Sequence, residues 1–194
     1  MYAKTIALVL ATALLGAAAP TASPELTART CTSANPSVID VLDAAYPNAG
    51  STGVTFSIAR TGGPGTNTKK TAILFKDIPA GATGCMLKVE WPANLDMGEG
   101  SNTANVFTTE DFAGWTPSWN NPPRTLAQVS STNFPTDYNS PAYWTYLYSS
   151  TCSPNMGFLF ELADWQQGPG NINFIHKGQG YKHSGAGFTL VYNC

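Results

Sequence analysis

Charged residues are scarce in this sequence of 194 residues. Only 11% of the residues are charged, and 10 Lys and Arg against 12 Asp and Glu leave a formal net charge of −2. The basic side chains form no cluster of the kind that binds a phosphate backbone, so we expect no nucleic-acid partner. The many Gly, Pro, Ser, Thr and Asn residues are instead typical of turn-rich β-structure.

Long apolar runs are also missing, so we expect no segment that crosses a membrane. The run at residues 6–15 follows Lys4 and gives way to small residues, which is the arrangement of a secretory signal peptide. With Gly16 and Ala18 before the cleavage point, residues 1–18 are predicted to be that signal peptide. The protein is therefore expected to be secreted, and either extracellular or associated with a cell wall.

Residues 19–29 are polar and contain proline, with no apolar period, which is typical of a short leader. They end in a Leu-x-x-Arg pattern that is similar to the leaders of many fungal secreted proteins, where a kexin-type protease trims them. Trimming after Arg29 and an untrimmed tail both fit the sequence. Residues 30–194 are expected to form a single domain, long enough to bury a core.

Cysteine is rare, and its pattern favours disulfides over metal binding. The sequence contains no C-x-x-C pair, so a zinc ribbon is not expected. An even number of cysteines in an exported chain predicts two disulfides, although three connectivities are possible. We favour Cys31–Cys194, which would tie both ends into the domain, with Cys85–Cys152 as the second bridge.

Short runs of alternating apolar and polar residues recur through the domain. In residues 85–91, for example, Leu87, Val89 and Trp91 share one face. Turn-forming residues separate nine such runs, at residues 54–60, 71–75, 85–91, 104–109, 125–131, 143–148, 156–163, 171–175 and 187–193. The pattern predicts an all-β fold, a two-sheet antiparallel β-sandwich that is jelly-roll-like.

One segment, residues 35–48, carries a helical signal, so we expect at most one short helix, near the mature N-terminus. Asn35 could cap this helix, and Pro36 suits its first turn. Apolar residues recur near the helical period at Val38, Val41, Leu42 and Ala45. A strand fits the segment nearly as well.

A family resemblance rests on residues 75–92 (FKDIPAGATGCMLKVEWP), the ending GFTLVYNC and the early stretch CTSANPSVIDVLDAAYPN. These stretches resemble the fungal family called the But-two, or Uba-three-binding, C-terminal domain, and their motifs are structural. The resemblance implies a small secreted β-sandwich from a filamentous fungus. The family name refers to an intracellular enzyme that activates a ubiquitin-like modifier, and we do not extend that partner to a chain with an export signal.

Both histidines, His176 and His183, lie in the Gly-rich stretch HKGQGYKHSGAG. Alternating runs on either side predict a terminal hairpin with this stretch as its loop. A metal site would need a third ligand, usually Asp or Glu, and none lies in the hairpin. We therefore predict a surface loop, with no metal and no cofactor.

Signatures of catalysis are likewise missing from the sequence. It has no Gly-x-Ser-x-Gly motif, and its cysteines are better explained as disulfides than as nucleophiles. Glu90 and Glu161 are the best candidates for the acid pair of a glycoside hydrolase, because each lies opposite the apolar face of its strand. A solvated outer face explains the same pattern, so we expect a non-catalytic protein and keep the hydrolase as an alternative.

Aromatic residues gather in one part of the chain. Residues 107–148 hold ten of the 22 (5 Trp, 8 Tyr and 9 Phe). The candidate ligand-binding residues in a Pro-rich loop are Trp115, Trp119, Asn120 and Asn121, because aromatic faces beside amides suit sugar rings.

The strand that follows carries Trp144, Tyr146 and Tyr148, which we expect to line the core. The favoured function is a secreted non-catalytic domain that binds a cell-wall polysaccharide or another surface ligand. A structural or host-interacting surface protein with extracellular protein partners is the main alternative. Exposure of Trp115 and Trp119 would favour the first function, and complete burial of both, with an exposed bare sheet edge, would favour the second.

Overall fold

The computed structural model describes residues 30–177 and 185–194. The expected signal peptide and leader, residues 1–18 and 19–29, lie outside this part of the chain. The described residues form strands and no helix, and so no helix that could cross a membrane. In chain order the strands are β1 (Thr32–Ala34), β2 (Val38–Asp43), β3 (Thr55–Arg60), β4 (Asn67–Phe75), β5 (Cys85–Trp91), β6 (Gly98–Gly100), β7 (Thr103–Thr109), β8 (Thr125–Asn133), β9 (Tyr143–Ser150), β10 (Met156–Leu162), β11 (Gly170–Ile175) and β12 (Gly187–Tyr192).

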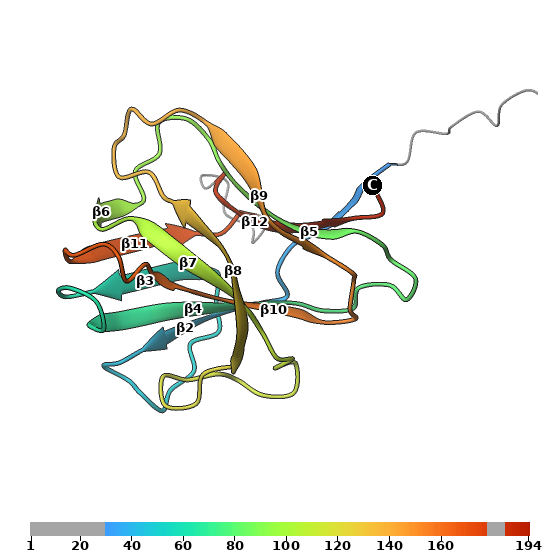
Figure 1. Cartoon of the computed structure of the whole chain (residues 1–194), viewed down its shortest axis with the longest axis horizontal. Helices are drawn as coiled ribbons and strands as arrows, with labels where there is room; N and C mark the ends of the chain where they lie inside the picture. Colours follow the sequence, from blue (N-terminus) through green and yellow to red (C-terminus); the bar gives the residue numbers. More distant parts are fainter. Residues whose placement is uncertain (1–29, 178–184) are drawn as a thin grey trace, which may run out of the picture.

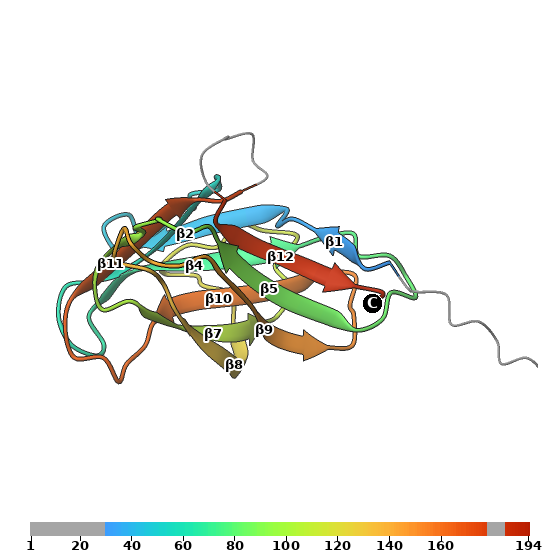
Figure 2. The same ribbon diagram turned by 90° about the horizontal axis from the view of Figure 1, so that it is seen from above.

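Two antiparallel sheets pack against each other (Figures 1 and 2). One has four strands in the order β1-β12-β5-β9, and the other has eight, in the order β6-β11-β3-β4-β10-β7-β8 with β2 paired to β4. This arrangement confirms the predicted all-β, two-sheet antiparallel sandwich. Each of the nine alternating runs coincides with a strand, from β3 to β5 and from β7 to β12.

The main core lies between the sheets and is rich in phenylalanine. The ring of Phe56 on β3 has its centroid 4.9 Å from that of Phe174 on β11 and 5.2 Å from that of Phe188 on β12. All three side chains are buried, and burying each one contributes about 1.5–3 kcal/mol to folding. The contacts between Phe188 and the other two therefore join the four-stranded sheet to the eight-stranded sheet.

Residues 38–43 form strand β2, so the helical signal at residues 35–48 was wrong. The strand runs beside β4, with Val38 opposite Leu74 and Asp43 opposite Lys69. Its two faces are both covered: Ile39 packs in the main core, whereas Leu42 packs in a second apolar cluster on the other side of the sheet. A strand buried on both faces has no period of two, because apolar residues suit either face.

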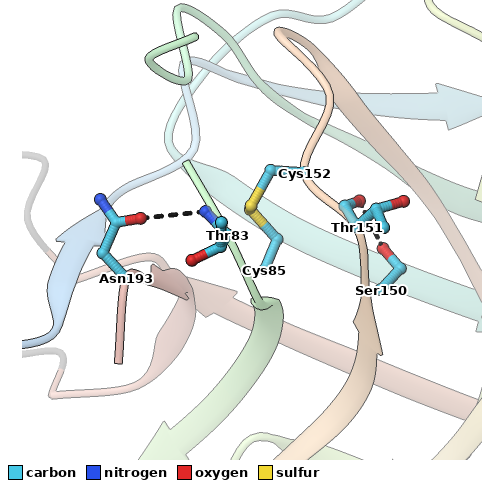
Figure 3. The surroundings of a disulfide bond; sticks show 6 residues. All are labelled: Thr83, Cys85, Ser150, Thr151, Cys152 and Asn193. Atoms are coloured by element: carbon cyan, nitrogen blue, oxygen red, sulfur yellow. Dashed lines mark hydrogen bonds between the residues drawn. A yellow bond between two sulfur atoms is a disulfide. The ribbon is translucent and has the colours of Figure 1, made fainter. Parts of the chain in front are cut away.

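Both disulfides have the favoured connectivity, Cys31–Cys194 and Cys85–Cys152, and no described cysteine is free. The Cα atoms of the first pair are 4.3 Å apart and those of the second pair 5.1 Å. Cys85 opens β5 and lies opposite Ser150 of β9, so Cys152 is in reach just after β9 ends (Figure 3). Two disulfides fit a secreted or extracellular protein.

Asn193 connects the C-terminal end of the chain to the same region. Its side-chain oxygen accepts a hydrogen bond from the backbone N–H of Thr83 at 2.9 Å, two residues before Cys85 (Figure 3). The N–H of Asn193 donates to the Thr83 carbonyl in return, at 2.8 Å. The chain beyond β12 is therefore held both by the Cys194 bridge and by this reciprocal pair.

The segment between β11 and β12 is not a hairpin loop, contrary to the expectation. β11 pairs with β3 and β6 in the eight-stranded sheet, whereas β12 pairs with β1 and β5 in the four-stranded sheet. The segment is therefore a crossover from one sheet to the other. Residues 178–184 of this segment, which include His183, lie outside the described part of the chain.

Candidate functional site

The loop with the two candidate tryptophans folds over the outer face of the eight-stranded sheet. Trp119 packs, half-buried, against the second apolar cluster of Leu42, Ala72, Leu74, Phe112 and Leu159. The Lys70 Nζ atom lies 5.6 Å from the centroid of the Trp119 ring, so one face of that ring already has a partner. Trp115 is 37% exposed and contacts Phe112 edge to face, with the ring centroids 6.1 Å apart.

The neighbouring asparagines are exposed, and their hydrogen bonds hold this loop and join it to the connection between β2 and β3. The Asn120 N–H donates to the Pro47 carbonyl at 2.9 Å, and its side-chain amide donates to Asn48 at 2.8 Å. The Asn121 N–H donates to the Ser118 carbonyl at 3.2 Å. The loop therefore holds Trp119, Asn120 and Asn121 as parts of a cover for the second cluster, and Trp115 is its most accessible ring.

The two candidate acids lie on opposite outer surfaces of the sandwich. Glu90 is on β5, on the face opposite the core, where it forms ion pairs with Lys88 and Lys177. Burial raises the pKa of Glu90, but its hydrogen bonds to Lys177 and Lys88 outweigh that effect and hold the pKa below its usual value. Glu161 is on β10 of the other sheet, paired with Lys70. Because two packed sheets separate them, these acids cannot flank one glycosidic bond.

Two of the three aromatic residues expected to line the core of β9 point outward instead. Trp144 is 60% exposed and Tyr146 is 44% exposed. The pairing of β9 with β5 shifts register between Leu87 and Lys88, so that Leu147 takes a core position and Tyr148 packs at its border. A bulge thus changes which residues of β9 face inward, and sequence alternation cannot reveal it.

A groove of about 590 Å³ opens at the end of the sandwich where β5 and β8 finish and where β7 and β9 begin. The connection from β8 to β9, which contributes residues 134, 135, 140 and 141 to the lining, is the loop at the upper left in Figure 1. The residues that line it are Trp91, Thr103, Ser131, Thr132, Asn133, Phe134, Pro135, Ser140, Pro141, Tyr143 and Trp165. None of these residues is charged, and three of them are Trp or Tyr.

Two aromatic side chains of the groove, Trp91 and Tyr143, pack against each other and against the core. Trp91 is buried, and its ring stacks on that of Tyr143 with the centroids 4.8 Å apart and the planes 29° apart. Trp91 also contacts Phe134 of the core, at 5.8 Å between centroids. The exposed ring of Tyr143 is therefore held in place by its contact with the buried Trp91. Trp165, from the turn after β10, is 63% exposed.

Polar side chains from the end of β8 complete the lining. Ser131 and Asn133 are exposed, and the Asn133 side-chain oxygen accepts a hydrogen bond from the Thr103 hydroxyl. This bond fixes the Asn133 amide so that its nitrogen is left as a donor. Hydroxyl and amide groups beside exposed rings form a surface that can contact both the faces and the edges of a ligand.

Sequence reasoning did not identify Tyr143 and Trp165 as site residues. Tyr143 begins a strand of which the three later aromatic residues were expected to line the core, and Trp165 is a lone aromatic residue in the polar stretch ADWQQGPG. A large aromatic residue in a Gly- and Pro-containing turn is itself a signal of an exposed contact residue. Its partners in the groove come from distant parts of the chain, so the sequence does not show that they meet.

His176 is buried at the start of the crossover between the sheets. Its Nε2 atom accepts a hydrogen bond from the Phe188 N–H at 2.7 Å, and its Nδ1 atom bonds the Lys177 carbonyl. Burial lowers the pKa of His176, and the Lys177 carbonyl and the Phe188 carbonyl, the latter 2.9 Å from Nε2, offset this only in part because they favour the protonated ring. Among residues 30–177 and 185–194, no group of three His, Cys, Asp or Glu side chains could hold a metal ion.

The sequence was also compared with known proteins. No family model matches it, and no curated protein gives a significant match. The resemblance to the But-two C-terminal domain family, noted from residues 75–92 and the ends of the domain, therefore stays a prediction.

Proposed function

We propose that this protein is a secreted, non-catalytic domain that binds a neutral polysaccharide of a cell wall through the groove beside Tyr143 and Trp165. The observation that carries the proposal is the pair of exposed rings in an uncharged groove, one of them stacked on the buried Trp91. Secretion is supported by the two disulfides and by the signal-peptide pattern of residues 1–18.

The chemistry of the lining favours a sugar. A pyranose ring presents C–H groups on its faces, which pack on aromatic rings, and hydroxyls at its edge, which bond to amides and hydroxyls. The rings of Tyr143 and Trp165 supply the first kind of contact, and Asn133 and Ser131 supply the second.

The same lining favours a neutral polymer over a charged one. A polymer of uronic acids would place carboxylates in a groove that offers no Lys or Arg, and a polyamine such as deacetylated chitin would find no Asp or Glu. Chitin and β-glucans are the neutral wall polymers that meet these conditions.

A glycan-array screen of the secreted protein tests the proposal. We expect binding to neutral β-linked glucose or N-acetylglucosamine oligomers, and weaker or no binding to uronic acid and glucosamine oligomers of the same length. Binding only to charged glycans, or to none, would contradict it.

The loop residues Trp115 and Trp119 remain a second proposed contact for the same ligand, with Trp115 the more accessible ring. Substitution of Trp115 by Ala should then weaken retention on chitin or β-glucan while the fold stays intact. Unchanged retention would leave the groove as the sole contact. If the variant does not fold, Trp115 is needed for the packing of the second cluster and not for binding.

A structural or host-interacting surface protein is the second candidate function, favoured by one observation. Strand β8 is the last strand of the eight-stranded sheet, spans nine residues, carries no charge and is mostly exposed. An edge of this kind can pair with a strand of another protein. Protein partners captured equally by the wild type and by a Trp165→Ala variant would favour this function over glycan binding.

A further inference from the structure

Trp165 stands on a turn that is not held by apolar packing. Residues 163–169 connect β10 to β11, and only Ala163 among them is buried. Trp165 itself contributes little to the core, because most of its surface is exposed. Hydrogen bonds must therefore keep this turn in one conformation.

Arg60, at the end of β3, supplies most of these bonds although it is only 3% exposed. Its Nε atom donates to the Gly168 carbonyl at 2.8 Å and its Nη1 atom to the Ala163 carbonyl at 2.9 Å. Its Nη2 atom donates to the Gln166 carbonyl and to the Ser101 hydroxyl, the latter at 3.0 Å. One guanidinium thus binds three carbonyls that span the turn.

Ser101 and Gln166 extend this network. The Ser101 hydroxyl donates to the Gly168 carbonyl at 2.8 Å, and its backbone N–H donates to the Pro169 carbonyl at 2.8 Å. The Gln166 side-chain oxygen accepts from the Thr103 N–H at 2.8 Å. The Ala163 N–H also donates to the Thr103 carbonyl, at 2.8 Å, and Thr103 lines the groove, so the turn is joined to the groove on both sides of Trp165.

A buried guanidinium is costly unless it is paired or fully hydrogen-bonded. Arg60 forms no ion pair in the described part of the chain, so its hydrogen bonds must compensate for its burial. The planar fork of arginine suits it to bind several carbonyls in fixed directions, which an ammonium cannot do. The carbonyls that it binds all belong to the turn with Trp165, so its role concerns that turn.

We propose that Arg60 is a positioning residue, which holds the turn of residues 163–169 so that Trp165 is a fixed wall of the groove before any ligand arrives. This inference rests on the proposed function in its second half, because it assigns the fixed ring to polysaccharide binding. A ring that is already ordered loses less conformational entropy when a ligand stacks on it.

Amide hydrogen exchange tests the first half without a ligand. In Arg60→Lys the charge is kept and the fork is lost, so exchange at Gln166, whose N–H donates to the Ala163 carbonyl at 3.1 Å, should become at least about tenfold faster. Exchange in β4 and β10 should be unchanged. Unchanged exchange at Gln166 in the folded variant would overturn the inference. Should Arg60→Lys fail to fold, Ser101→Ala removes an acceptor of the Arg60 Nη2 atom and a donor to the Gly168 carbonyl, and unchanged exchange at Gln166 in that variant would count against the network through which Arg60 acts.

Retention on insoluble β-glucan and chitin tests the second half in a double-mutant cycle. Arg60→Lys should weaken binding by about 2- to 13-fold, the effect of leaving one side chain to be ordered on binding. In the Trp165→Ala background the same substitution should cause no further loss, because Arg60 acts through that ring. Equal losses in both backgrounds would overturn the positioning role.

Arg124→Lys is the matched control, because Arg124 is an exposed arginine paired with Glu110 at 3.3 Å. It should change neither exchange at Gln166 nor retention. A wild-type protein that binds neither polysaccharide would contradict the proposed function, and the exchange measurement would still decide whether Arg60 holds the turn.

Discussion

Burial keeps the ring of His176 in its neutral form, against the opposing effect of the Lys177 and Phe188 carbonyls beside it. Its Nε2 atom accepts from the Phe188 N–H, so that nitrogen carries no proton, and Nδ1 carries the proton that bonds the Lys177 carbonyl. The arrangement joins the start of the crossover to β12, and so links the two sheets.

The stability of the protein should therefore fall as the pH drops below the pKa of an unfolded histidine, about 6.5. Because burial lowers the pKa of His176 in the folded state, the unfolded state binds more protons in this window, and unfolding becomes easier. Urea denaturation from pH 7.5 to pH 5 should show a decreasing free energy of unfolding. His176→Asn should flatten this dependence, and an unchanged slope in that variant would contradict the role assigned to the ring.

At the level of strands, alternation in the sequence was enough to locate nine of them, including β5 with its bounds. It failed for β2, which is buried on both faces, and for β1 and β6, which have three residues each. It also failed for the partners of β11 and β12, because a local pattern shows that a segment is extended but not which strand lies beside it. Two strands adjacent in the chain proved to belong to different sheets.

The burial of β2 on both faces leads to a quantitative prediction. Leu42→Ala should lower the free energy of unfolding by about 2–5 kcal/mol, because Leu42 is buried in the second apolar cluster and its loss leaves a cavity. Val41→Ala, at a half-buried position on the same strand, should cost less than Leu42→Ala. Chemical denaturation with circular dichroism compares the two, and equal small losses would show that the second cluster contributes little.

Two disulfides of very different sequence separation, 163 and 67 residues, close the molecule as a whole. The first joins the two ends of the domain, and the second fastens the start of β5 to the end of β9. Both were favoured from the sequence by the argument that one bridge should tie the ends. Their positions relative to the sheets could not be predicted, because strand order was unknown.

Removing either bridge should destabilise the protein by about 2–5 kcal/mol. The comparison is between the double substitutions Cys31→Ser with Cys194→Ser and Cys85→Ser with Cys152→Ser, each measured by urea denaturation. The native protein should also take up no alkylating reagent, as judged by intact mass. An alkylated cysteine in the native protein, or a double variant as stable as the wild type, would contradict this account of the fold.

The groove is the feature that the sequence concealed most completely. Its lining comes from the ends of β5 and β8, the starts of β7 and β9, and the turn after β10. Trp91, Tyr143 and Trp165 are separated by tens of residues, and only the closing of the sandwich brings them together. Composition predicted that aromatic residues would meet polar ones, but the predicted location was the loop with Trp115 and Trp119.

The most direct test of the proposed polysaccharide site is the affinity of the secreted protein for chitin and β-glucan after removal of one groove ring. Trp165→Ala and Tyr143→Ala should each weaken retention by the equivalent of about 1–3 kcal/mol, by analogy with other aromatic stacking platforms, with the thermal unfolding midpoint close to that of the wild type. Tyr46→Ala, which removes an exposed ring outside the groove, should leave retention unchanged. Equal retention of all four proteins, or no retention of the wild type, would contradict the account.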